Sequence, residues 1–415
     1  MNRFYLLNLF FCFTVLAAGQ RSLNLQQAEE LLQKNNLQLL AEQFNITASQ
    51  AEVIQAKIWE QPYITAEFNL INPQNHTRFD VGPEGQKAVA IQQLIYLGGK
   101  KKNEINYTKS NLALATLEFE QLMRNLKYQL HLTFYTIYFN QLKIKSLDAQ
   151  IVIIDNLVKN YDLQANKGNV ALREVVRLQS LVLNLKNERN EIYQDQLNSQ
   201  NNLSLLTGIT ELATPQVNEA ELLNKFQNKQ LAKDSILSTA LANNLDYLST
   251  IKAIENQALY LKWQRSIARP DITTGISYDQ RGGAFQNQVN FTLGVPLPLW
   301  NKNKGNIQLA EAQLQQTQIN RDFKKLQVQQ QAEMYFQLWQ QQVNQYKNID
   351  PTTVSNLDAV YNGMLSNFEK RNLTMLEFTD FMESYNQSTI QINELKKALI
   401  ISGINLNYIT NKENF

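Results

Sequence analysis

The chain has 415 residues, of which only 14 are glycine and 8 are proline, so few residues are available to end helices or strands. Charged residues make up 18%, aromatic residues make up 10%, and the formal net charge is +2 at pH 7. This near-neutral charge excludes the basic surface expected of a nucleic-acid-binding protein, and the aromatic content argues against disorder. We therefore expect a folded chain built from long elements.

The N-terminus has the pattern of a secretory signal peptide over residues 1–19, with a charged start, an apolar run and small residues at its end. Cys12, the one cysteine of the chain, lies inside this run, so the mature protein should have no thiol. Lipid attachment at Cys12 is the alternative interpretation. It is disfavoured because Phe10 and Phe11 stand where small residues are expected.

A long helix is predicted over residues 99–167, which contain no proline and no glycine between their first residue and Gly168. Two rows of apolar residues recur there at intervals of seven: Met123, Leu130, Ile137, Ile144, Ile151 and Val158, and Ile105, Leu112, Phe119 and Leu126. Such spacing keeps an apolar stripe facing a partner when helices coil around each other. The pattern predicts a coiled-coil helix of about 100 Å that packs between two neighbours.

Shorter helices flank this long helix in the sequence. Apolar residues recur at helical spacing over residues 25–59, and the pattern ends before Pro62, which cannot continue a helix. A helical pattern resumes over residues 171–206, after a tight turn at Gly168. We expect the helix after Gly168 to pack antiparallel to the long helix.

Four segments alternate polar and apolar residues with the period of a β-strand. They are residues 63–71, 87–96, 272–279 and 288–295. Each strand would have one apolar and one polar face, which suits a wall between lipid and water; two hairpins covering a soluble core are the alternative. No other segment beyond the signal approaches about 18 continuous apolar residues, so a membrane crossing would have to use strands. Four strands are too few for a barrel, which needs about eight, so closure requires several copies.

The first half of the chain recurs in the second half. Asn36 recurs as Asn244, displaced by 208 positions, and Asn169 recurs as Asn372, displaced by 203 positions. The displacement is constant on each side of the hairpin loop and changes only at that loop, which indicates an internal duplication.

The repeat pattern divides the chain into segments: a signal peptide at 1–19, a first repeat at 20–208, an irregular connector at 209–232, a second repeat at 233–410 and a tail at 411–415. Pro351 interrupts the second long helix and has no counterpart in the first, so the two halves should differ there.

Residues 97–101 (LGGKK) and residues 295–307 (VPLPLWNKNKGNI) resemble the signatures of the outer-membrane efflux duct family of the TolC type. The second segment resembles the cation-efflux branch of that family. The resemblance implies a mainly α fold with β, in which long antiparallel coiled-coil helices form a periplasmic α-barrel. Four strands from each chain of a homotrimer would join in a 12-stranded outer-membrane β-barrel.

The resemblance also implies a function, namely a passive exit duct in the outer membrane with a long periplasmic extension. It would receive cargo from an inner-membrane pump of the RND type through a periplasmic adaptor protein, contact outer-membrane lipid, and need no cofactor. Metal cations are the cargo that the resemblance favours, with organic cargo left open. A soluble periplasmic coiled-coil scaffold or adaptor is the alternative class.

An enzyme is not expected, since no nucleophile elbow or phosphate-binding loop appears in the sequence. His76 and His131 are the two histidines, too few and without a flanking acidic cluster for a catalytic metal site. We interpret His131 as a packed or hydrated helix residue.

The resemblance places adaptor contacts at the two helix tips, and these are Lys167, Gly168 and Asn169 in the first copy and Lys370, Arg371 and Asn372 in the second. Arg371 stands where glycine is common, which puts the usual turn geometry in question there.

Acidic residues that ring the closed pore in the family correspond to Glu377 and Asp380, with Glu174 and Arg177 at the matching first-copy positions. Three copies of a carboxylate around a narrow lumen would concentrate cations. Solvated charges on a helix surface are the alternative interpretation.

Aromatic residues at predicted strand ends suggest a membrane-interface girdle. They are Tyr63, Tyr96, Tyr278 and Trp300.

Overall fold

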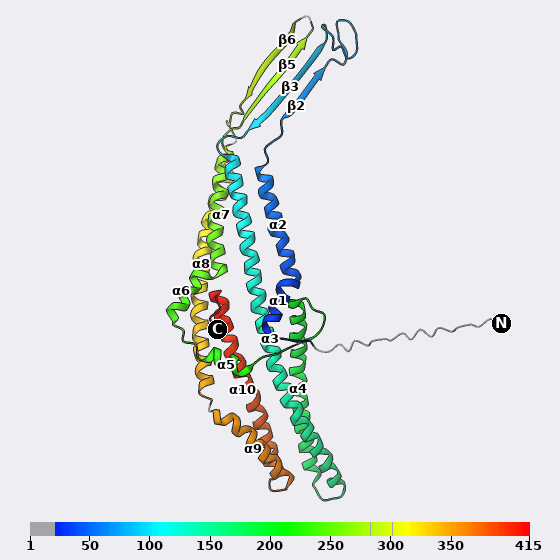
Figure 1. Ribbon diagram of the computed structural model, residues 1–415, viewed down its shortest axis with the longest axis vertical. Coiled ribbons are helices and arrows are strands. Elements are labelled where there is room, and N and C mark those ends of the chain that lie inside the picture. Colours follow the sequence, from blue (N-terminus) through cyan, green and yellow to red (C-terminus); the bar gives the residue numbers. More distant parts are fainter. Residues whose placement is uncertain (1–20, 283, 301, 350) are drawn as a thin grey trace, which may run out of the picture.

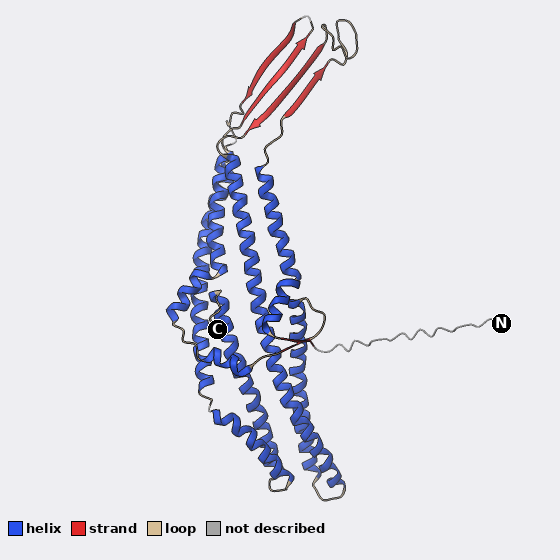
Figure 2. Cartoon of the chain, in the orientation of Figure 1, coloured by secondary structure: helices blue, strands red, loops and turns tan. Residues whose placement is uncertain are grey.

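The computed structural model describes residues 21–282, 284–300, 302–349 and 351–415, so the predicted signal peptide at 1–19 lies outside the described residues. The molecule is a long rod, with a four-stranded sheet at one end and two helical hairpin turns at the other (Figures 1 and 2). The prediction of a mainly α fold with β is confirmed.

Most elements occur twice in the chain. The first half contains β1 (Arg21–Leu23), α1 (Leu25–Asn35), α2 (Leu37–Lys57), β2 (Tyr63–Phe68), β3 (Gln86–Ile95), α3 (Lys100–Asn166) and α4 (Leu172–Thr207). The second half contains α6 (Lys233–Asn243), α7 (Leu245–Ile267), β5 (Ile272–Arg281), β6 (Phe285–Gly294), α8 (Lys304–Lys347), α9 (Pro351–Glu369) and α10 (Met375–Thr410). Helix α10 begins and ends 203 positions after α4, as the duplication predicts.

Helix α3 is the long helix that the heptad pattern predicts, and it has 67 residues. All ten residues of its two apolar rows are buried or half-buried. It packs against α2 and α7 toward the sheet and against α4 and α10 toward the tips. The largest core cluster surrounds its middle, where Leu130, Phe134 and Ile137 are almost fully buried.

Three sequence interpretations need correction. The helix predicted over 25–59 is broken at Asn36. The connector is not irregular, because it contains β4 (Ala213–Pro215), which pairs in parallel with β1, and α5 (Glu219–Gln227). The first predicted strand, 63–71, is shorter and ends at Phe68.

The second long helix is interrupted as Pro351 predicts. Helix α8 ends at Lys347, and α9 begins at Pro351 and leaves the line of α8 (Figure 1). A proline at the first position of a helix is tolerated because its missing N–H would have no partner there.

The large sheet has the strand order β2-β3-β5-β6 with antiparallel neighbours, so β2 and β6 are edges that no other described strand of this chain pairs with. One row across it consists of apolar side chains, Ile64, Ile91, Ile276 and Phe291, which are 66%, 46%, 57% and 71% exposed. The next row consists of Thr65, Ala90, Ser277 and Asn290. The sheet therefore has one exposed apolar face and one face of small and polar residues.

Two asparagines join helices end to end. The Asn36 side-chain oxygen accepts hydrogen bonds from the Gln38 and Leu39 amides at 3.0 and 3.1 Å, which caps α2. The Asn36 side-chain nitrogen donates to the Leu206 carbonyl in the last turn of α4 at 3.0 Å. One side chain thus satisfies backbone groups of two helices.

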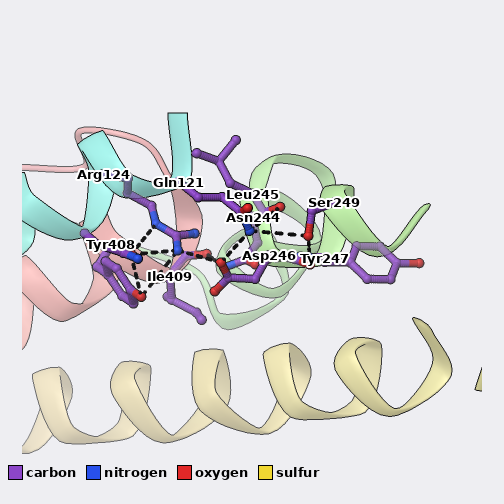
Figure 3. Close-up of polar contacts among 10 residues, drawn as sticks. Gln121, Arg124, Asn244, Leu245, Asp246, Tyr247, Ser249, Tyr408 and Ile409 are labelled. Carbon is purple, nitrogen blue, oxygen red and sulfur yellow. Dashed lines mark hydrogen bonds and ion pairs between the residues drawn. The ribbon is translucent and has the colours of Figure 1, made fainter. Parts of the chain in front are cut away.

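The second copy repeats this junction. The Asn244 side chain accepts from the Tyr247 amide at 3.1 Å, which caps α7, and donates to the Ile409 carbonyl of α10 at 3.0 Å (Figure 3). The repeated Asn-Asn-Leu sequence that revealed the duplication therefore marks a break between helices.

We expect the variant Asn36→Ala to weaken the α2–α4 junction by about 1–2 kcal/mol, since it removes a cap and leaves the Leu206 carbonyl without its donor. Amide hydrogen exchange at Gln38 and Leu39 should become faster. Asn202→Ala, an exposed substitution in α4, is the matched control. Equal exchange rates in the two variants would contradict the junction's role.

Candidate functional site

The two helix tips form the end of the rod that lies farthest from the sheet (Figure 1). At the first tip Gly168 has φ 75°. Its amide donates to the Ala165 carbonyl, and the Asn169 amide donates to the Gln164 carbonyl, both at 2.9 Å. A residue in the left-handed conformation and two backbone hydrogen bonds to carbonyls of the last helical turn together end α3.

The second tip has the same geometry although it lacks the glycine. Arg371 has φ 61°, its amide donates to the Phe368 carbonyl at 3.0 Å, and the Asn372 amide donates to the Asn367 carbonyl at 2.9 Å. Arg371 therefore adopts the turn geometry that glycine has at the first tip, although the sequence had put that geometry in question. A non-glycine residue in this conformation costs about 1–2 kcal/mol.

The predicted tip residues are solvent-exposed in both copies. Nearby apolar side chains are exposed as well: Leu163, Leu172, Val176 and Leu376. The tips thus offer cations, from Lys167, Lys370 and Arg371, beside apolar contact area.

An aromatic stack ties the two tips together. Tyr161 of α3 stacks on Phe368 of α9 with ring centroids 5.6 Å apart, and Phe368 stacks on Phe378 of α10 at 4.0 Å. Phe368 and Phe378 are nearly fully buried. Separation of the tips would have to break this stack.

Glu377 has a structural role at the start of α10. The Thr374 hydroxyl and amide donate to its carboxylate at 2.7 and 2.9 Å, and the Glu377 amide donates to the Thr374 hydroxyl at 3.2 Å. This capping box lowers the Glu377 pKa below its usual value of 4.5, chiefly through the Thr374 amide, so the exposed carboxylate is ionised at neutral pH. Ala171 replaces the threonine in the first copy, so Glu174 has no such partner.

No hydrogen bond or ion pair between described residues joins any two of the four candidate gate residues within one chain. Asp380 and Arg177 are exposed, Glu174 is half-buried, and none of the four forms an ion pair with another described residue. A carboxylate ring at this level would require other copies of the chain.

The four candidate interface aromatics lie in different environments. Trp300 is 92% exposed beyond the end of β6. Tyr96 follows β3, packs against Trp59 with ring centroids 5.9 Å apart, and donates its hydroxyl to Glu60 at 3.1 Å. Tyr278 is in β5 on the apolar face, and its hydroxyl donates to Asn287 at 2.8 Å. Tyr63 shares a register row with Gln92 and lies on the polar face, a position that argues against a lipid contact for this residue.

A polar network that was not predicted from the sequence lies beside the second junction (Figure 3). Arg124 of α3 is 8% exposed, forms an ion pair with Asp246 of α7 at 2.7 Å, and lies over the ring of Tyr408 of α10 at 4.6 Å. Gln121 donates to the same carboxylate at 2.9 Å. A buried arginine that joins three helices is a positioning element. Arg124 lies in neither of the two heptad rows, so the apolar pattern of the sequence did not reveal it.

His131 does not lie in a metal-binding cluster. Its ring nitrogen contacts the Glu29 carboxylate at 2.6 Å, and Lys127 contacts the same carboxylate at 3.2 Å. Glu29 has a pKa below the usual value, mainly because of the His131 hydrogen bond. Among the described residues no group of three potential metal ligands occurs. In that same part of the chain no helix is both long enough and apolar enough to cross a membrane.

We expect Arg371→Gly to stabilise the second tip by about 1 kcal/mol, because glycine adopts the left-handed conformation without strain. Amide hydrogen exchange over residues 367–374 should become slower. Gly168→Arg, the reciprocal change at the first tip, should speed exchange there by a similar factor, because a Cβ at Gly168 meets no atom within 4 Å and the backbone conformation is the cost that remains. Faster exchange in Arg371→Gly would refute this account of the turn.

Comparison with known proteins relates this geometry to solved structures. No protein-family model matches the sequence, and no curated protein matches it. The Campylobacter jejuni CmeC outer membrane channel superimposes with a TM-score of 0.74 at 13% identity, over 94% of this chain and 86% of that one.

CusC, in a structure described for transmembrane channel formation, gives a TM-score of 0.73 at 16% identity, over 94% of this chain and 93% of that one. The open state of the Neisseria gonorrhoeae MtrE outer membrane channel gives 0.66 at 11% identity, over 94% and 89%. The chain therefore has the fold of the TolC-type outer-membrane channels, as the sequence resemblance implied.

Proposed function

We propose that this protein is the outer-membrane channel of a tripartite efflux system, in which three copies form one passive exit duct. It performs no reaction and uses no cofactor. The fold it shares with outer-membrane channels supports the proposal. The observation that carries it is the large sheet, which has an exposed apolar face and two unpaired edges.

The sheet is stable in this form only when it is joined to other sheets. An exposed row of isoleucine and phenylalanine is costly in water and suits lipid, while Thr65, Ser277 and Asn290 suit a water-filled lumen. Edge strands β2 and β6 present free backbone groups, which cannot stay unpaired in a membrane. Pairing β6 of one chain with β2 of the next keeps the antiparallel order, and three chains of four strands close a 12-stranded barrel.

The two outermost helices of the rod continue the two edge strands of the sheet. Below the sheet their order is α2-α3-α7-α8, so α2 continues the β2 edge and α8 continues the β6 edge. Both edge helices expose apolar side chains: Leu37, Phe44 and Ile54 on α2, and Ile319, Phe323 and Leu326 on α8. One head-to-tail contact would therefore close the barrel and the helical tube together.

The tips are the proposed contact with a periplasmic adaptor, which links the duct to an inner-membrane pump of the RND type. Their exposed lysines, Arg371 and neighbouring leucines offer both charge and apolar area for such a contact. Localisation in the outer membrane follows, with the helices in the periplasm. The proposal that the cargo includes metal cations rests on the resemblance of residues 295–307 to the cation-efflux branch.

The alternative, a soluble periplasmic scaffold, would need something to cover the apolar face of the sheet. No described helix of the chain packs on that face, which extends beyond the end of the helical rod (Figure 2). This favours the duct.

We expect Phe291→Asp to impair assembly, because a carboxylate facing lipid costs on the order of 2 kcal/mol in each chain. Asn290→Asp, one position along the same strand, places the same charge in the lumen and should be tolerated. Two quantities are measured. One is the amount of protein in the outer-membrane fraction, and the other is the amount of trimer that migrates as such on a gel and dissociates when the sample is heated. Equal effects of the two variants would overturn the assignment of the faces.

We expect the double variant Glu377→Ala, Asp380→Ala to change the conductance or cation selectivity of single channels in planar bilayers, because it removes six carboxylates from one trimer. Thr374→Ala serves as the control for the loss of the capping box, since it leaves both carboxylates in place. If currents are unchanged in the double variant, or change equally in Thr374→Ala, the two carboxylates do not line a gate.

A further inference from the structure

A pocket of about 350 Å³ lies where the sheet meets the helices. It is formed by the start of α3, the segment before β5 and the linker from β6 to α8, and residues that line it include Lys100, Arg269, Leu297 and Trp300. Lys100, Leu297 and Trp300 belong to the two sequence segments that resemble the duct family, but no ligand has been assigned to the pocket that they line.

The linker presents an apolar edge to solvent. Leu297, Leu299 and Trp300 are 71%, 63% and 92% exposed. Pro296 and Pro298 restrict the backbone between them, so these side chains are held outward without a covering element. Trp300 combines an apolar ring with an N–H donor, which is the chemistry of a membrane interface.

The chain segments that meet at this pocket carry more cations than acids, and Lys100 and Arg269 line the pocket itself. Six belong to the junction: Lys100, Lys101, Lys102, Arg269, Lys302 and Lys304. Asp271 pairs with Lys100 at 2.7 Å and Glu104 pairs with Lys101 at 3.1 Å, while Glu60 accepts a hydrogen bond from Tyr96. The remaining four cations have no ion-pair partner among the described residues.

Arg269 is held at the pocket by its neighbours. Its aliphatic chain lies so close to Gly98 that a Cβ there would be 2.4 Å from the Arg269 Cδ. Asp271, two residues further on, accepts from the Leu97 amide at 3.0 Å, and Asn303 donates to the Gln264 carbonyl at 2.8 Å. These contacts fix the segments on either side of the pocket, and Arg269 as a residue is exposed.

We propose that this junction binds the phosphate of an anionic phospholipid, one per chain, with its acyl chains along the apolar face of the sheet. Arg269, assisted by Lys302, contacts the phosphate, and Leu297 and Trp300 contact the glycerol and upper acyl region. Charge complementarity favours an anionic over a zwitterionic lipid, since each nearby cation adds attraction at an anionic surface. The inference rests on the proposed membrane orientation and adds to it a lipid class and a site.

The test is native mass spectrometry of the purified trimer in detergent, titrated with phosphatidylglycerol or with phosphatidylcholine of the same acyl chains. We expect up to three phosphatidylglycerol molecules per trimer and clearly weaker phosphatidylcholine binding. The double variant Arg269→Gln, Lys302→Gln should bind phosphatidylglycerol at least tenfold more weakly, about fivefold for each cation removed. Lys325→Gln on α8, far from the junction, should bind as the unaltered protein does.

A second arm separates a lipid site from a general phosphate site. Inorganic phosphate at 10-fold molar excess over lipid should not displace phosphatidylglycerol, because it lacks the acyl contacts; displacement would overturn the lipid assignment. Equal binding of the two lipids, or no loss in the double variant, would also overturn it. Failure of the duct proposal is separately visible, because the protein would then not be a trimer in the same spectra.

Discussion

The structure depends on two asparagine side chains that each connect the ends of two helices. Helix α3 needs partners along all of its 67 residues, and no other helix in the described chain is as long. Helices α2 and α4 supply one side in succession and α7 and α10 the other, with Asn36 and Asn244 satisfying the backbone groups at each break. The breaks also let the chain leave the rod toward α1 and α6 without exposing unpaired helix ends.

This arrangement gives the sheet and the helical rod common edges. Because α2 precedes β2 and α8 follows β6, the two unpaired strand edges continue into two helices with exposed apolar side chains. A chain with matching open edges over its whole length is self-complementary in a head-to-tail sense. Such a contact closes a ring when the rotation between copies divides a full turn without a rise along the axis. The proposed trimeric duct follows from that geometry.

Features that repeat along the sequence could be predicted, and features that depend on distant partners could not. The heptads of α3 and the alternation in β5 and β6 are local patterns, and the structure has the helix and strands that they predict. The displacement from Asn169 to Asn372 is a repeat, and the backbone turns at the two positions match. The break at Asn36 was missed because helical spacing continues across it, and its partner, the Leu206 carbonyl, is 170 positions away. Likewise, Arg124 meets Asp246 across 122 positions, and the left-handed turn at Arg371 is fixed by backbone bonds that a side chain does not reveal.

The central claim is that one chain is an open third of a closed ring, and disulfide trapping across its edges tests it most directly. Cys12 is first replaced by serine, and Asn290→Cys in β6 is then combined with either Thr65→Cys or Glu67→Cys in β2. Both β2 positions lie on the polar face of the sheet. They cannot meet β6 of the same chain, because β3 and β5 lie between the two strands. The account predicts that at least one pair gives oxidised dimers and trimers and no larger species. Monomers alone, or a ladder that continues beyond three chains, would contradict it.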